Sequence, residues 1–162
     1  MARVYLALGS NLGKRLENLR DAVTRLGLRV RVEKISAVYE TEPWGIAEQP
    51  RFLNLVLAGE TALEPLELLE FVKKIEREMG RAETVRYGPR VIDIDILLYD
   101  QVRFKNEVLE IPHARLHERG FVLVPLAEIA PDAQHPRLKK SVRELLAMVS
   151  DTEDVKWFAR WE

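Results

Sequence analysis

The spacing of apolar residues divides most of the chain into strands and helices. Strict alternation of apolar and polar residues indicates a strand, whereas recurrence every three to four residues indicates a helix with one buried face. In chain order we predict a strand at 3–8, a helix at 16–26, a looser strand at 28–39, a strand at 52–59, a helix from Pro65 to Met79 and a strand at 91–99. Glycines at 27 and 80 are the expected ends of the two helices.

This order is that of the ferredoxin-like split βαβ arrangement, βαββαβ, in which two helices cover one face of an antiparallel sheet. We therefore predict an α+β fold with additional C-terminal strands and helices. Residues 107–111 and 120–125 are candidate further strands, and Ser141 followed by Glu144 predicts a capping box that begins a short last helix. Because 162 residues suit one core and no linker or repeat interrupts them, we expect a single domain over 1–162.

Composition excludes several classes of protein. The absence of cysteine rules out disulfides, thiolate metal sites and a cysteine nucleophile. A net charge of -1, from 25 basic and 26 acidic side chains, provides no overall field for binding nucleic acid or an anionic membrane. Neither a signal segment nor an apolar run long enough to cross a bilayer is present, so we predict a cytoplasmic protein.

Two aspartates interrupt the most regular predicted strand. Strand alternation places Asp93 and Asp95 on one face with their Cα atoms about 6.7 Å apart, where two carboxylates repel each other unless a cation lies between them. The opposite face carries Ile92, Ile94, Ile96 and Leu98, and the face of the aspartates also carries Val91, Leu97 and Tyr99. A solvated face is the alternative, but the apolar neighbours favour a site for a hard divalent cation, with magnesium preferred.

Four arginines surround the loop that leads to this strand: Arg77, Arg81, Arg86 and Arg90. Guanidinium groups beside a carboxylate-bound cation are suited to a polyphosphate. The helix dipole alone accounts for an arginine at position 77, whereas Arg90, close to Asp93, has no such explanation.

The common nucleotide and zinc motifs are absent. The segment 9–13, which contains two glycines, is not followed by the lysine of a P-loop and does not have the glycine spacing of a dinucleotide fingerprint. His113 and His117 have HxxxH spacing, but Ala114 occupies the position of the metalloprotease glutamate, so we reject a zinc protease. A polar role for His113 stays open, and we expect His117 and His135 at the surface.

The segment from Arg86 to Leu97, with sequence RYGPRVIDIDIL, resembles the signature of the 6-hydroxymethyl-7,8-dihydropterin pyrophosphokinase family of folate biosynthesis. Further segments resemble the same family in the same order along nearly the whole chain: 9–12, 39–45, 49–54, 75–76, 80–81, 112–113 and 119–121.

The resemblance implies an enzyme that transfers pyrophosphate from ATP, its co-substrate, to the pterin hydroxymethyl group and releases AMP. It implies two Mg²⁺ ions held by Asp93 and Asp95, with catalytic roles for these residues and for Arg81 and Arg90. The residues that match its ATP contacts are Glu76, Arg90, Ile96, His113 and Arg119. Those that match its pterin pocket are Thr41, Pro43, Trp44, Phe52, Asn54, Tyr87, Asp93 and Phe121.

The chain departs from the family pattern at Tyr87, where the family usually has a tryptophan, and at Glu42, where it usually has a proline. The stretch 82–85 is also shorter than in the family and lacks basic residues, whose work Arg86 could take over.

Two other classes of function stay open: a non-catalytic ferredoxin-like module for RNA or a small effector, and another metal-dependent transferase that uses the same aspartates. We expect a monomer that binds small-molecule substrates, and neither nucleic acid nor membrane.

Overall fold

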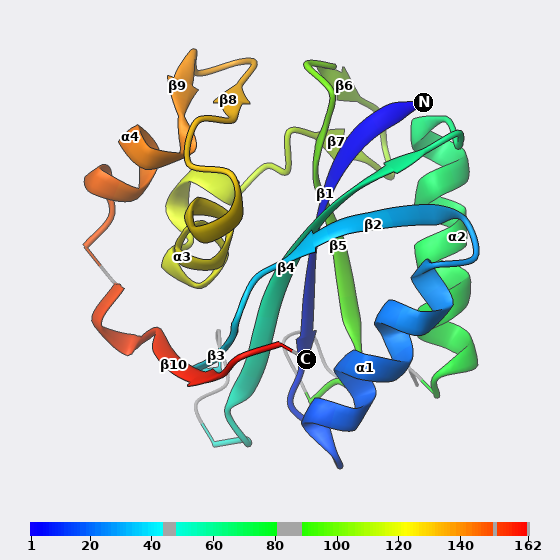
Figure 1. Ribbon diagram of the computed structural model, residues 1–162, viewed down its shortest axis with the longest axis vertical. Coiled ribbons are helices and arrows are strands. Elements are labelled where there is room, and N and C mark those ends of the chain that lie inside the picture. The colour runs from blue at the N-terminus through cyan, green and yellow to red at the C-terminus, as the bar shows by residue number, and fades with distance from the viewer. Residues whose placement is uncertain (44–47, 81–88, 151, 162) are drawn as a thin grey trace.

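A six-stranded antiparallel sheet with helices on both faces forms the centre of the computed structural model, which describes residues 1–43, 48–80, 89–150 and 152–161 (Figure 1). Its strands are β1 (Ala2–Ser10), β2 (Val30–Ile35), β3 (Val38–Thr41), β4 (Phe52–Thr61), β5 (Asp93–Tyr99) and β10 (Lys156–Ala159). They lie in the order β10-β3-β4-β1-β5, and β2 also pairs with β4. Two short hairpins complete the strands: β6 (Phe104–Lys105) with β7 (Glu110–Ile111), and β8 (Gln134–His135) with β9 (Lys140–Ser141).

The prediction of an α+β chain with an antiparallel sheet is confirmed, although the ferredoxin-like description stays an interpretation. The predicted strand at 28–39 is two strands, β2 and β3, which pair with successive parts of β4. Ser36 lies between them and is fully buried. Its hydroxyl accepts a hydrogen bond from the backbone N–H of Val56 at 3.0 Å and donates one to the carbonyl of Ala37, so this side chain satisfies two backbone groups at the break between the strands.

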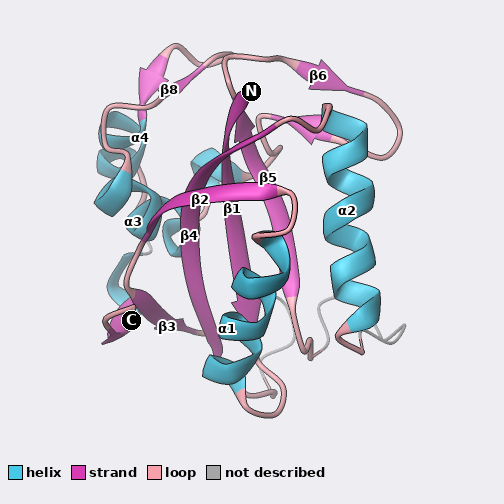
Figure 2. Cartoon of the chain, turned by 45° about the vertical axis from the view of Figure 1, so that its right-hand side comes forward, coloured by secondary structure: helices cyan, strands magenta, loops and turns pink. Residues whose placement is uncertain are grey.

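One face of the sheet is covered by α1 (Arg15–Leu26) and α2 (Pro65–Glu78), both of which were predicted (Figure 2). Proline at the first position and a capping box between Glu64 and Glu67 begin α2, which explains its sharp start after the turn. Apolar side chains from both helices meet the alternate apolar residues of β1, β4 and β5 in the larger core.

The other face is partly covered by α3 (Gly120–Ile129) and α4 (Val142–Met148). The prediction of a strand at 120–125 is wrong. The segment is apolar nearly throughout, and such a run has no period that separates a buried strand from a buried helix. The capping box of Ser141 and Glu144 is confirmed at the start of α4, with bonds of 3.1 and 3.0 Å. None of the helices that the structure describes is long and apolar enough to cross a membrane.

Strand β5 changes its alternation within its length. Its pairing with β1 shifts register beside Leu97, which is the extra residue of a bulge. Residues before the bulge follow the predicted faces, but Leu98 joins the core under α3, and Tyr99 turns to the core under α1 and α2. The predicted faces of Leu98 and Tyr99 are therefore reversed, while those of Asp93 and Asp95 are as expected.

Candidate active site

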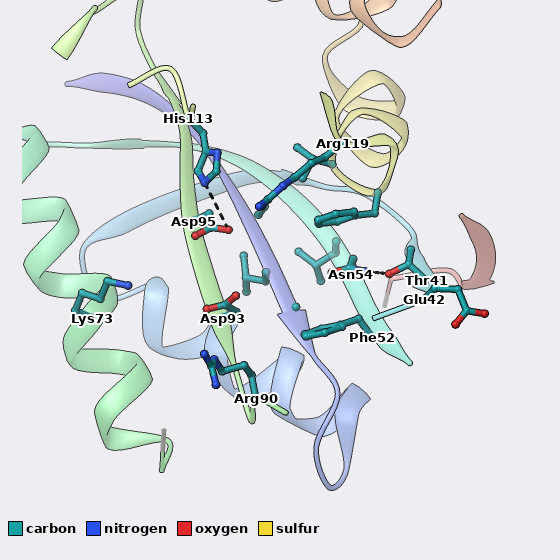
Figure 3. Close-up of a pocket in the computed structure, with 16 residues that line it drawn as sticks. Thr41, Glu42, Phe52, Asn54, Lys73, Arg90, Asp93, Asp95, His113 and Arg119 are labelled. Carbon is teal, nitrogen blue, oxygen red and sulfur yellow. Dashed lines mark hydrogen bonds and ion pairs between the residues drawn. The ribbon is translucent and has the colours of Figure 1, made fainter. Parts of the chain in front are cut away.

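A cavity of about 310 Å³ opens on the α3 side of the sheet, next to the first turn of α3 (Figure 3). The end of β1 forms its floor together with the first residues of β4 and β5, and η1 (Leu116–Glu118) leads from His113 to the start of α3 at its rim. The residues that line it are Ala7, Leu8, Gly9, Thr41, Glu42, Phe52, Asn54, Leu55, Lys73, Arg90, Asp93, Asp95, His113, Arg119, Phe121 and Val122.

Both predicted metal ligands face this cavity. Asp93 and Asp95 lie opposite Gly9 and Ala7 of β1, whose small side chains leave space above the sheet. Desolvation in the cavity raises the pKa of the Asp95 carboxyl to about 7, and the negative charge of Asp93 adds to the shift, while Arg119 and Lys73 oppose it. A desolvated carboxyl next to a second negative charge has the electrostatics of a cation site.

Magnesium fits this pair of donors. In the part of the chain that the structure describes, no cluster of three or more His, Asp and Glu side chains could enclose a metal ion. Mg²⁺ is commonly bound by one or two carboxylates, with water and substrate phosphates completing its octahedron. Asp93 and Asp95 would therefore hold the ion from the floor of the cavity and leave its other positions to a phosphorylated substrate.

His113 faces the same carboxylates. Its Nε2 lies 4.0 Å from Oδ2 of Asp95, and its Nδ1 accepts a hydrogen bond from the backbone N–H of Arg115 at 3.2 Å. Burial, with the nearby charge of Arg119, lowers the pKa of His113 to about 4. The ring is consequently neutral at pH 7 and carries its proton on Nε2, from which it can donate a hydrogen bond into the cavity.

One end of the cavity is built for a flat, hydrogen-bonding group. The Asn54 amide donates a hydrogen bond of 2.6 Å to Oγ1 of Thr41, and both side chains are buried. Gly9 lies beneath Asn54, where a Cβ would come within 2.7 Å of the amide oxygen and 3.3 Å of the Phe52 ring. Glycine at this position therefore keeps the end of the cavity open, with an amide and an aromatic ring in its wall.

Two arginines on the cavity wall are held by neighbouring groups. The Arg119 guanidinium lies over the Phe121 ring, with Cζ 5.5 Å from the ring centroid. The backbone N–H of Arg90 donates a 2.7 Å hydrogen bond to the side chain of Asn11, and the backbone N–H of Asn11 donates in return to the Arg90 carbonyl at 3.0 Å. Asn11 is fully buried and also donates to the Pro50 carbonyl at 3.0 Å, so one amide joins three segments that converge on the site.

The outer edge of β5 is closed by a side chain of α2. Glu76, 1% exposed, accepts a hydrogen bond of 2.8 Å from the backbone N–H of Ile94, a group that β1 does not pair. Lys73 lies one turn earlier on α2, with its Nζ 3.3 Å from the other oxygen of Glu76. Glu76 thus lies behind the aspartate strand, and Lys73 reaches the cavity around its edge.

The structure brings most of the predicted site together. Nine predicted residues line the cavity: Thr41, Phe52, Asn54, Arg90, Asp93, Asp95, His113, Arg119 and Phe121. Pro43 is half-buried next to this wall, Glu76 lies behind β5, and the side chain of Ile96 packs in the core. Trp44, Arg81 and Tyr87 lie outside the described residues.

His135, expected at the surface, is instead 1% exposed because its Nδ1 accepts two backbone N–H groups inside the β8–β9 hairpin.

Sequence reasoning missed some residues of the cavity. Lys73 and Glu42 are its unexpected charged members, and Ala7 and Gly9 form its floor. The spacing of three residues between Lys73 and Glu76 was a usable signal, since side chains so spaced lie on the same face of a helix. Asn11 lies in the segment 9–12 that resembles the family, but its hydrogen-bond partners are far away in the sequence, so no local pattern indicated its structural role.

A pair of neighbouring carboxylates, flanked by arginines and by an aromatic and amide wall, defines an enzyme site for a phosphorylated small molecule. The profile of the family described as "7,8-dihydro-6-hydroxymethylpterin-pyrophosphokinase (HPPK)" matches residues 5–131. The chain belongs to this family, and the prediction of a pyrophosphokinase of folate biosynthesis is confirmed at this level.

Similar proteins agree with this assignment. The chain is 46% identical over 144 residues to the 2-amino-4-hydroxy-6-hydroxymethyldihydropteridine pyrophosphokinase of Aquifex aeolicus, a match that covers 89% of this chain and 90% of that protein. It is 48% identical over 132 residues to the Bacillus subtilis enzyme of the same name, covering 80% and 79%. A crystal structure of Plasmodium falciparum HPPK-DHPS with pterin and p-hydroxybenzoate has the same fold, with a TM-score of 0.70 at 18% identity over 90% of this chain and 42% of that longer one.

Proposed function

We propose that this protein transfers the pyrophosphoryl group of ATP to the hydroxymethyl oxygen of 6-hydroxymethyl-7,8-dihydropterin and releases AMP. The observation that carries the proposal is the position of Asp93 and Asp95 between two unlike ends of one cavity (Figure 3). The amide and aromatic wall on one side suits a planar heterocycle, and the cationic side chains suit phosphates.

In the proposed complex the pterin lies at the end formed by Thr41, Asn54 and Phe52, under Phe121. Asn54 and Thr41 read its polar edge by hydrogen bonds, and the rings of Phe52 and Phe121 pack on its faces. Pro43, Trp44 and Tyr87 are proposed members of the same pocket from the family resemblance.

The nucleotide phosphates then lie across the aspartates. Asp93 and Asp95 would hold Mg²⁺, with two ions proposed, and the metal would supply positive charge to neutralise the phosphates. Arg90 and Arg119 bind phosphate oxygens, and His113 donates from Nε2. Glu76 and Ile96 match nucleotide contacts of the family; because the Glu76 carboxylate and the Ile96 side chain are buried, their proposed contribution is to position β5 and its backbone. Arg81 is proposed, from the same resemblance, as a catalytic residue.

The reaction needs no covalent intermediate. The hydroxymethyl oxygen forms a bond to the β-phosphorus while the bond from that phosphorus to the bridging oxygen of the α-phosphate breaks. The hydroxyl proton passes to water, and the electron pair of the broken bond stays on AMP. Catalysis in such a reaction comes from alignment and charge neutralisation, both of which the cavity supplies.

The first test measures AMP release from ATP and magnesium with and without the pterin, for wild type, Asp95→Ala and the exposed control Asp132→Asn. Release that needs the pterin and is lost only in Asp95→Ala supports the proposal. Intact ATP together with pterin binding would instead favour a non-catalytic effector-binding module. ATP binding without any pterin binding would favour a different transferase. The monomeric state and the cytoplasmic location stay predictions.

A further inference from the structure

Lys73 is the one lysine among the residues that line the cavity, and it comes from an unexpected direction. Its helix, α2, packs against the opposite face of the sheet. Figure 3 shows the side chain extending toward the strand that carries Asp93 and Asp95, from the side away from Thr41 and Asn54. It therefore adds a positive charge to the end of the site that faces away from the amide and aromatic wall.

The position of this lysine is fixed by the edge of β5. The hydrogen bond from the Ile94 N–H to Glu76 holds α2 against that edge, and Glu76 in turn holds the Lys73 ammonium at 3.3 Å. An ammonium group has three donors, and the side chain of Lys73 is 45% exposed, so it can bind a further oxygen without leaving Glu76. The buried carboxylate thus orients the lysine, and the cavity gives it access to a ligand.

The order of groups along the cavity indicates which part of the substrates lies next to Lys73. The acceptor end lies on one side of the aspartates and Lys73 on the other. In a displacement at phosphorus, the attacking and leaving oxygens lie on opposite sides of the transferred group. With the acceptor at Asn54 and the transferred phosphates over the aspartates, the leaving nucleotide falls on the side of Lys73.

We propose that Lys73 binds the α-phosphate of the nucleotide and neutralises the charge that develops on AMP as it leaves. As the bond between the pterin oxygen and the β-phosphorus forms, the bond from the β-phosphorus to the bridging oxygen breaks and leaves its electron pair on AMP. The hydroxyl proton passes to water, and Lys73 keeps its own proton throughout. The inference rests on the proposed function and adds the residue that serves the leaving group.

The test compares Lys73→Met, which keeps the length of the side chain and removes its charge, with Lys74→Met on the exposed face of the same helix. We expect Lys73→Met to lower kcat by about 10- to 100-fold, because it removes a positive charge that acts where negative charge develops. AMP binding, measured by calorimetry with magnesium, should weaken about tenfold, with pterin affinity unchanged. Lys73→Arg should restore part of the AMP affinity, and Lys74→Met should match wild type.

The outcomes separate this inference from the proposed function. Wild-type kcat and AMP affinity in Lys73→Met would overturn it. A purely structural role would lower pterin affinity and the unfolding temperature together with kcat, and that result would also overturn it. If wild type binds AMP but shows no pterin-dependent release, the proposed function fails, while weaker AMP binding by Lys73→Met still assigns the phosphate to Lys73. Absence of AMP binding by wild type would refute both.

Discussion

The two faces of β5 differ in what their side chains do. Ile94 and Ile96, together with Ile92 just before the strand, point to the core under α1 and α2 and are at most 4% exposed. Asp93 and Asp95 alternate with them, face the cavity and are only half-buried. One strand thus anchors the hydrophobic core with one set of residues and presents a charged site with the other, so substitutions on the two faces should affect different properties.

The largest expected effect is on the cavity face. Asp95→Asn keeps the shape of the side chain but removes a charge, and we expect it to reduce AMP formation by about 1000-fold or more. Its free energy of unfolding, measured without magnesium, should stay unchanged or rise, because repulsion from Asp93 disappears. Kinetic assays measure the loss of AMP formation, and urea unfolding measures the free energy of unfolding. A stability loss as large as that of a core substitution would contradict the separation of the two faces.

On the core face, Ile94→Ala should lower stability and largely keep activity. Removal of buried methyl groups from a well-packed core lowers the free energy of unfolding by about 3 kcal/mol. The smaller change Ile94→Val should cost about 1 kcal/mol. Activity per folded molecule, corrected by the unfolding curve, should stay within about tenfold of wild type, since the backbone bond from Ile94 to Glu76 is kept. Loss of activity comparable to Asp95→Asn would show that the faces are not independent.

Substitution of Asn11 should affect both stability and substrate binding. Asn11→Ala removes the acceptor for the Arg90 N–H and the donor to the Pro50 carbonyl, and we expect a stability loss of about 2 kcal/mol with higher KM for the substrates. The control Asn106→Ala removes a side chain that accepts two backbone hydrogen bonds in the β6–β7 turn, away from the cavity. That variant should lose stability alone. Unchanged KM values in Asn11→Ala would mean that Asn11 does not position the site.

A change in pH should affect stability through His135, which lies outside the cavity, without affecting the site itself. Burial lowers its pKa from 6.5 to about 4, and the charges of Arg137, His117 and Arg103 contribute. Because the unfolded chain binds the proton more readily, the stabilisation is fully present above pH 6.5 and is lost as the pH falls toward 4, by about 2 kcal/mol. In His135→Asn, whose amide oxygen can replace Nδ1 as acceptor for Leu138, urea unfolding should show a shallower slope between these pH values. If the free energy of unfolding depends on pH equally in both proteins, His135 is not the group responsible for that dependence.

Sequence patterns predicted most elements that have a strong period. The aspartate pair was found because polar residues interrupt the clear alternation of β5, and α1 and α2 were found because they are amphipathic. The segment that forms α3 is apolar nearly throughout and shows no period that separates a strand from a helix. The bulge at Leu97 depends on pairing with β1, which no local pattern encodes.

The site was predictable where a local motif or the family resemblance identified a residue. It was not predictable where tertiary contacts create the role. The spacing of Lys73 and Glu76 places both side chains on one face of α2, but the contact of that face with the edge of β5 is tertiary. Asn11 joins segments almost 80 residues apart in the chain. His135 looked like a surface residue because its partners are backbone groups of a hairpin, which the pattern of side chains does not reveal.

The central position of β1 also has a consequence for folding. This first strand pairs with β4 on one side and with β5 on the other, so its second edge is completed only by residues 93–99. Until those residues leave the ribosome, a growing chain exposes an apolar strand with unpaired backbone groups, which is the kind of edge that associates with other chains. The late pairing is also the one that brings Asp93 to Gly9, so the chain acquires its reactive centre in the same step that closes its sheet. Fragments that end before β5 should therefore be both inactive and prone to aggregate.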